Sequence, residues 1–219
     1  MSLKTSDYYK TKSCWKIRIF DLIFSAILLI ITSPLIILVA VIVSIDLGFP
    51  PLYISERVGK NNQKYYHLKF KSMRPGKTTG RIFFETERLS KLGKFLRNCH
   101  IDELPELLLI FMGKMSFVGP RPLPLQLQPV FMFNYRTSVR PGWTGLAQLK
   151  LIRTGKLTKK LQFKFDRYYI QHQSLTFNIK IILSTLITAL NSVPLDLDPQ
   201  GSEDRIQFQK KYIDDNQDH

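Results

Sequence analysis

Residues 22–45 read LIFSAILLIITSPLIILVAVIVSI, a run of 24 residues that contains no charged side chain. A helix of this length, at ~1.5 Å per residue, is long enough to cross a hydrocarbon core of ~30 Å. The run is too long for a cleaved signal peptide, and Ser44-Ile45-Asp46 at its end offers no small-x-small cleavage site. The sequence therefore predicts a membrane segment that stays in the mature protein.

A proline stands near the middle of this run, in the sequence Thr32-Ser33-Pro34. Proline removes a backbone donor and clashes with the preceding turn, which costs roughly 3 kcal/mol in a helix interior. The Ser33 hydroxyl can return a hydrogen bond to the backbone carbonyls that proline leaves unpaired. Ser33 and Pro34 are therefore the candidate residues for a break in the membrane helix.

Basic residues lie on both sides of the apolar run, and the positive-inside rule draws both ends to the cytoplasmic side. Lys16 and Arg18 closely precede the run, while Arg57 and Lys60 follow soon after it. Together with the proline, this pattern predicts a re-entrant segment that enters one leaflet, breaks and exits on the same face. A kinked spanning helix is the alternative, and composition alone favours it because spanning helices tolerate proline.

The 219-residue chain carries 32 Lys and Arg against 17 Asp and Glu, a net charge of +15. Residues 196–219 hold seven of the acidic residues and three of the basic ones, so residues 1–195 carry +19. Such an excess predicts an anionic partner: nucleic acid, a membrane surface or phosphate-bearing substrates. The hydrophobic content of 44% excludes a disordered polymer. The two cysteines, Cys14 and Cys99, are too few for a disulfide framework or a four-cysteine zinc site, so reduced thiols are expected.

The rest of the chain predicts an α+β, mainly helical fold, with a re-entrant helix-break-helix, amphipathic interfacial helices and a small β-hairpin. Its apolar helix near the C-terminus is too short to span a membrane, so it is core or a second interfacial element. The expected elements are strands at 52–58 and 64–70, a basic amphipathic helix at 88–99, a buried helix at 103–113 and an apolar helix at 179–190.

The chain divides into four predicted parts along its length. They are a basic N-terminal segment (1–14), the re-entrant membrane helix (15–47), a catalytic domain on the cytosolic face (48–195) and an acidic mobile tail (196–219).

Asp102 and Glu103 stand directly before a helix that Pro105 opens. A helix N-terminus stabilises carboxylates, which explains most such pairs, but it also attracts phosphate and so suits a nucleophilic aspartate with a phosphorylated substrate. Adjacent helical positions diverge by about 100°, so the two carboxylates cannot easily grip one atom together. One is therefore expected to attack phosphorus and the other to hold a hard cation.

Arg121 lies between two prolines, in the sequence Gly119-Pro120-Arg121-Pro122. Fixed backbone angles around a guanidinium suit bidentate contact with phosphate oxygens. The sequence PGWTG at 141–145 is a second tight turn, whose glycines serve chain reversal or close approach to a ligand. The four histidines show no metal-ligand spacing. No Walker-type or dinucleotide-type glycine loop occurs, so a nucleotide would have to bind through another kind of site.

Seven short motifs follow one another along the chain. They are Ile19-Phe20-Asp21, Ser33-Pro34, Arg57-Val58-Gly59, Lys69-Phe70-Lys71-Ser72-Met73, Asp102-Glu103-Leu104-Pro105, Met115-Ser116-Phe117-Val118-Gly119-Pro120-Arg121-Pro122 and Pro141-Gly142-Trp143-Thr144-Gly145. In their order and approximate spacing, from about residue 15 to 190, the chain closely resembles the bacterial sugar transferases, the monotopic polyprenyl-phosphate phosphoglycosyl transferases. Each motif alone is common, but seven in sequence are specific.

This resemblance implies an enzyme with a re-entrant helix on the cytoplasmic face of the bacterial inner membrane. Such an enzyme moves a sugar-1-phosphate from a nucleotide diphosphate-sugar, in particular a UDP-sugar, to polyprenyl (undecaprenyl) phosphate, which begins the assembly of a polysaccharide or other glycan. The implied partners are these two substrates, membrane lipid and downstream glycosyltransferases, without nucleic acid.

The resemblance also implies roles for individual residues. By motif match, Asp102 is the nucleophile that forms a covalent aspartyl-phosphosugar, and Glu103 binds Mg²⁺. The other implied site residues are Arg97, Arg121 and Lys69 as phosphate contacts and Asp166 as a supporting residue. Arginines, lysines and a cation are the groups that stabilise the negative charge of a transferring phosphate.

Three positions depart from the family pattern: Lys71 replaces an arginine, Lys114 an acidic residue and Asn178 an aspartate. These departures bear on metal affinity and on the sugar site. They are also the one hint of an inactive scaffold. The charge of +19 on residues 1–195 and the basic helix support a second alternative, a non-catalytic membrane-anchored module whose basic face binds anionic lipid or nucleic acid. The retained Asp102-Glu103 pair favours the enzyme.

Overall fold

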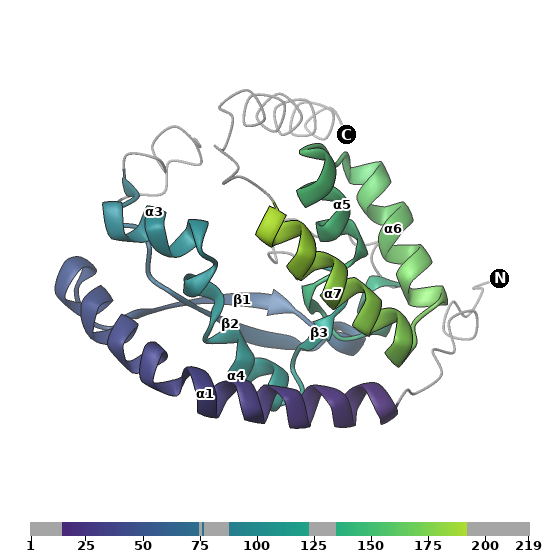
Figure 1. The fold of residues 1–219 in the computed structure, drawn as a ribbon, viewed down its shortest axis with the longest axis horizontal. Coiled ribbons are helices and arrows are strands. Elements are labelled where there is room, and N and C mark those ends of the chain that lie inside the picture. Colours follow the sequence, from purple (N-terminus) through teal and green to yellow (C-terminus); the bar gives the residue numbers. More distant parts are fainter. Residues whose placement is uncertain (1–14, 75, 77–87, 123–134, 192–219) are drawn as a thin grey trace, which may run out of the picture.

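The computed structural model describes residues 15–74, 76, 88–122 and 135–191, and these residues form a mainly helical structure with two small sheets. The first element is α1 (Trp15–Leu47), a helix of 33 residues that runs along one whole side of the structure (Figure 1). In the described part of the chain, α1 is the one helix long and apolar enough to cross a membrane, and only 11% of its most apolar window is buried. Most of the apolar side chains of α1 are exposed, which is consistent with the predicted membrane segment.

Helix α1 continues through Ser33 and Pro34, so the expected break does not interrupt the helix; instead its path bends (Figure 1). The Ile30 carbonyl would normally accept a hydrogen bond from the backbone nitrogen of residue 34, which proline lacks. The Ser33 Oγ donates to this carbonyl at 2.8 Å, and Thr32 Oγ1 donates to the Leu28 carbonyl at 2.7 Å. The expected hydroxyl compensation is confirmed, and it explains why the helix survives its proline.

The predicted hairpin is confirmed with its expected bounds. Strands β1 (Leu52–Val58) and β2 (Lys64–Phe70) pair antiparallel, from Leu52 opposite Phe70 to Val58 opposite Lys64. The 3₁₀ turn between them, η1 (Lys60–Asn62), places two asparagines in the left-handed region, which asparagine tolerates. The second half of α1 packs on this hairpin and on α3 (Lys91–Asn98) through a small apolar core: Val39, Val43, Leu47, Phe70 and Leu96.

Helix α3 is shorter than the amphipathic helix expected at 88–99, because Ser90 caps its N-terminus by accepting a hydrogen bond from Gly93 N at 2.9 Å. A 3₁₀ turn, η2 (Ile101–Glu103), and then α4 (Glu106–Phe111) replace the single helix expected at 103–113. Arg18 of α1 donates to the carbonyls of Ile110 and Phe111 at 2.7 Å each, so it caps the C-terminal end of α4.

A second sheet was not predicted from the sequence: β3 (Ser116–Val118) pairs parallel to β4 (Gly142–Thr144). Both strands lie in stretches rich in Gly and Pro, which read as turns. Their glycines permit backbones to approach each other rather than a ligand: a Cβ on Gly142 would lie 2.0 Å from Gly119 N. This contact brings the 119–122 and 141–145 segments together.

The C-terminal part consists of η4 (Arg136–Ser138), α5 (Leu146–Thr154), α6 (Lys159–Gln171) and α7 (Leu175–Asn191). Helix α7 contains the expected apolar segment and buries Ile181 in the main core, while Leu186 and Ile187 on its other face are exposed. The expected basic segment at 1–14 and acidic tail at 196–219 lie outside the described residues.

We predict that Gly142→Ala lowers the free energy of unfolding by about 3 kcal/mol, because the added methyl group forces two paired backbones apart. Gly155→Ala is the control: its Cβ meets open space, so the substitution costs only the left-handed strain of φ +66°, about 1 kcal/mol. Urea unfolding of both variants in detergent, followed by circular dichroism, measures the difference. Equal losses would mean that the β3–β4 approach is not under steric constraint.

Candidate active site

Asp102 and Glu103 lie in the η2 turn, between α3 and α4. His100, which precedes them, adopts a left-handed conformation with φ 56°, and this reverses the chain between the two helices. Asp102 is 6% exposed, and the side chain of Glu103 is 16% exposed. The two carboxylates expected to carry the chemistry therefore lie next to each other and are shielded from solvent.

Glu103 is surrounded by positive charge. Lys69 Nζ, from β2, makes a direct hydrogen-bonded ion pair with Glu103 Oε1, and Arg121 Nη2 lies 4.0 Å from the same oxygen. Burial alone would raise the pKa of Glu103, but the charges of Lys69 and Arg121 outweigh burial and hold this pKa below its usual value. Glu103 is therefore an ionised carboxylate at neutral pH.

Asp102 has the opposite electrostatic character. Burial and the neighbouring charge of Glu103 raise the pKa of Asp102 above its usual value, and the nearby cations Lys69 and Arg97 offset this only in part. A carboxylate of raised pKa is more basic than an ordinary aspartate, as a nucleophile should be. The environment thus gives the two adjacent carboxylates different properties.

The three expected phosphate-binding residues approach the carboxylates from three parts of the fold. Lys69 comes from β2, Arg97 from the last turn of α3 and Arg121 from the segment after β3. Arg97 is oriented by a hydrogen bond from its Nε to Ser72 Oγ, at 2.9 Å. A cationic cluster of this kind fits the phosphate groups expected of the substrates.

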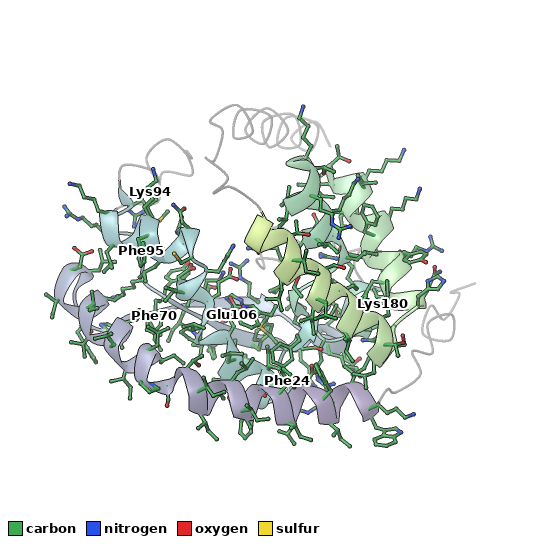
Figure 2. The ribbon with its side chains drawn as sticks, viewed as in Figure 1. Phe24, Phe70, Lys94, Phe95, Glu106 and Lys180 are labelled. Carbon is green, nitrogen blue, oxygen red and sulfur yellow. The ribbon has the colours of Figure 1, made fainter. Side chains whose placement is uncertain are left out.

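Glu106 is a central residue that the sequence analysis missed. It is 3% exposed, near the middle of the structure (Figure 2), and its Oε1 lies 3.2 Å from Lys69 Nζ and 3.3 Å from His67 Nε2. Lys69 is therefore held between Glu103 and Glu106, which lie three residues apart on one side of a helical turn. Two sequence features could have pointed to Glu106: its spacing from Glu103, and the alternation of His67 and Lys69 along a strand.

Asp166 lies on α6 and is 2% exposed. Its Oδ2 accepts a hydrogen bond from Arg136 Nε at 2.9 Å, and Arg136 Nη2 donates to the Arg121 carbonyl at 3.0 Å. Asp166 thus reaches the site through Arg136, a residue that the sequence analysis did not single out. Its supporting role stays a prediction, with a defined physical route: it fixes the backbone that carries the Arg121 guanidinium.

The remaining expected residues lie away from this cluster. Ser33 and Pro34 are within α1, where they shape the helix. Asn178, one of the departures from the family pattern, is buried, with its Oδ1 3.0 Å from Tyr169 Oη. The same hydroxyl lies 2.8 Å from the Val118 carbonyl, so Asn178 helps to pack α7 against β3 and α6.

Within the described ranges, no group of three or more His, Cys, Asp and Glu side chains is placed to hold a metal ion. The cation at Glu103 stays a prediction, in which substrate phosphates and water supply the other ligands. Mg²⁺ accepts such an arrangement, since it retains several waters and needs only one or two protein carboxylates.

Comparison of the sequence with known proteins places this chain in a family. The sequence profile of the bacterial sugar transferases matches residues 12–192. The chain is 31% identical to the exopolysaccharide production protein PSS of Rhizobium leguminosarum bv. phaseoli, over 79% of this chain and 94% of that protein. It is 33% identical to the uncharacterized sugar transferase EpsL of Bacillus subtilis, over 80% of this chain and 87% of that protein.

A larger relative carries a named activity. The chain is 32% identical to a UDP-glucose:undecaprenyl-phosphate glucose-1-phosphate transferase of Klebsiella pneumoniae, over 77% of this chain but only 39% of that protein. The range of the family profile, residues 12–192, contains the carboxylate and cation cluster described above. On this evidence, the chain belongs to the bacterial sugar transferase family.

Proposed function

We propose that this protein transfers a sugar-1-phosphate from a nucleotide diphosphate-sugar, a UDP-sugar, to undecaprenyl phosphate. The observation that carries the proposal is the buried Asp102, whose pKa is raised, beside an ionised Glu103 and among Lys69, Arg97 and Arg121. Relatives named as UDP-sugar:undecaprenyl-phosphate transferases support the two substrates. The product would be the first lipid-linked sugar of a glycan.

In the first step, a carboxylate oxygen of Asp102 attacks the phosphorus that bears the sugar. The bond from this phosphorus to the bridging oxygen breaks, and the nucleoside monophosphate leaves with the electron pair. Lys69, Arg97 and Arg121 lie where they can neutralise charge on the phosphate oxygens as it moves. The result is a covalent aspartyl-phosphosugar.

In the second step, an oxygen of the lipid phosphate attacks the same phosphorus from the side that the nucleotide has left. The bond to Asp102 breaks and restores its carboxylate, so no net proton transfer is needed. Two in-line displacements replace one reaction in which a soluble donor and a lipid acceptor would have to meet at once.

Glu103 is the residue proposed to hold Mg²⁺, because it stays ionised next to the nucleophile. Bound there together with substrate phosphates, the ion would supply Lewis-acid stabilisation of the diphosphate charge. Lys69 and Arg121 lie beside Oε1 of Glu103, and their positive charge favours the ionised carboxylate that a cation would need.

The arrangement of α1 supports a re-entrant topology on the cytoplasmic face of the inner membrane. In the first half of α1, Arg18 binds α4, and Asp21 Oδ1 accepts a hydrogen bond from Phe117 N at 3.2 Å. In the second half, Val43 and Leu47 pack against the hairpin and α3. A straight spanning helix would carry one of these halves away from the catalytic domain, whereas a bent helix lying in one leaflet keeps both in contact.

We predict that Asp102→Asn lowers nucleoside monophosphate release by about 10³-fold or more and abolishes the covalent adduct. Burial disfavours the charged form of Asp102, so the neutral amide should not lower the melting temperature at neutral pH. Intact mass spectrometry of protein incubated with UDP-sugars and Mg²⁺ detects the adduct. Asp46→Asn, at an exposed carboxylate, is the matched control. Normal turnover by Asp102→Asn would rule out this nucleophile.

The raised pKa of Asp102 predicts that the rate rises with pH through a value above the ordinary aspartate range. Arg97 favours the ionised form, so Arg97→Gln should move this acidic limb to higher pH, in addition to slowing the reaction. Profiles of kcat/KM against pH for monophosphate release test the shift. Lys94→Gln, an exposed change on the same helix, should leave the limb in place. A limb that moves to lower pH in Arg97→Gln would contradict the assignment.

For topology, we predict that Cys14 and Cys99 react with an impermeant maleimide from the same side of the membrane. Cys14 lies outside the described residues, and Cys99 is an exposed free thiol. Single-cysteine variants in oriented vesicles give the two accessibilities separately. Pro34→Ala should shift the segment toward a spanning state, because it restores the backbone donor to Ile30. Labelling of the two wild-type cysteines from opposite sides would establish a spanning helix instead.

A further inference from the structure

One face of the hairpin is directed toward the active site. Side chains alternate between the two faces of a strand, so Tyr65, His67 and Lys69 of β2 share one face. The contacts of His67 and Lys69 with Glu106 identify this face as the one that meets α4. On β1, Arg57 is the register partner of Tyr65, and Ser55 is the partner of His67, so both belong to the same face.

This face carries buried polar atoms that have no hydrogen-bond partner among the described residues. They are Arg57 Nε, Tyr65 Oη and Ser55 Oγ. Proteins satisfy the great majority of their buried polar groups, and isolated exceptions are expensive. Three such atoms on one hairpin face indicate a site whose hydrogen bonds are completed by a ligand.

The charges around Arg57 indicate what that ligand is. Arg57 interacts electrostatically with Arg121 as well as with Glu106 and Tyr65. Burial is the main cause that lowers the pKa of Arg57, and the like charge of Arg121 lowers it further. The two guanidiniums therefore repel each other. A guanidinium remains charged in proteins, and its planar donors match the oxygens of phosphate. An anion with several oxygens would relieve the repulsion and satisfy the unpaired donors.

We propose that Arg57, with the Tyr65 hydroxyl beside it, forms a second phosphate-binding subsite next to Arg121. It would hold the phosphate that Asp102 does not attack, either the nucleotide phosphate of the donor or the phosphate of the lipid acceptor. The proposal rests on the proposed function for the identity of the substrates, but it can be tested by binding alone.

The first arm of the test measures binding of uridine monophosphate and of inorganic pyrophosphate to the full-length protein in nanodiscs by calorimetry. We expect Arg57→Gln to weaken binding by about 10- to 100-fold, the effect of losing a charge-assisted hydrogen bond. Lys64→Gln is the matched control, because it removes one positive charge from the opposite face of the hairpin, on the paired strand β2. The second arm measures adduct formation from UDP-sugars, and then transfer of the adduct to undecaprenyl phosphate.

The two arms distinguish the two sources of phosphate. Weaker nucleotide binding with slower adduct formation assigns the subsite to the donor. Unchanged nucleotide binding with a slow second transfer assigns it to the lipid phosphate. Nucleotide and pyrophosphate binding and both half-reactions within twofold of Lys64→Gln would overturn the proposal. If no UDP-sugar forms an adduct with the unmodified protein but ligand binding still depends on Arg57, the proposed function fails while the subsite stands.

Two further variants separate ligand binding from a structural role. Arg57→Lys keeps the charge and should retain binding in part, since it loses only the planar donors. Tyr65→Phe removes a hydroxyl that has no partner among the described residues, so it should weaken ligand binding without lowering the melting temperature. A lower melting temperature with unchanged ligand affinity in both variants would assign these residues to packing and would overturn the subsite.

Discussion

The position of Lys69 between two glutamates is the interaction on which the rest of the site depends. Lys69 pairs with Glu103 on one side and approaches Glu106 Oε1 to 3.2 Å on the other, so one ammonium joins β2 to both η2 and α4. Because these groups are shielded from water, each charge has a large effect on its neighbours. The ion pair keeps Glu103 ionised and leaves Asp102, the less compensated carboxylate, with the raised pKa.

The glycine and proline segments complete this arrangement from the opposite side. Gly119 and Gly142 let β3 and β4 pair at close range, and the chain then delivers Arg121 toward Glu103. The Arg136 and Asp166 pair holds the Arg121 backbone in place. The site therefore combines a local turn that carries the carboxylates with cations brought in from distant parts of the sequence.

The sequence predicted the parts of the fold that depend on interactions between residues close together in the chain. The hairpin, the length of α1 and the Ser33 hydrogen bond all follow from neighbouring residues, and all agree with the structure. The β3–β4 pairing was missed because it joins residues 26 positions apart, in segments whose glycine and proline content is typical of turns. Glu106 was missed because its spacing from Glu103 does not reveal that a lysine from a distant strand lies between the two glutamates.

The motifs identified Asp102, Glu103 and Arg121, but not the physical roles of their neighbours. His67 and Arg136 belong to none of these motifs, and Arg57 was named only as part of Arg57-Val58-Gly59. The importance of all three comes from side chains that tertiary folding places beside them. Charge compensation in a buried site depends on distances that a linear pattern does not contain.

With α1 in the membrane, as proposed above, the capping of α4 by Arg18 fixes the distance between the membrane segment and the carboxylates. Arg18 ties the last carbonyls of α4 to α1, and the carboxylates lie at the other end of α4. Six residues at ~1.5 Å each separate the two ends by about 9 Å, comparable to the headgroup layer of one leaflet, roughly 5–8 Å. With α1 at the boundary of the hydrocarbon, the isoprenoid chain of the acceptor stays among the acyl chains of the bilayer. Only its terminal phosphate has to reach the carboxylates, so no hydrophobic chain is exposed to water.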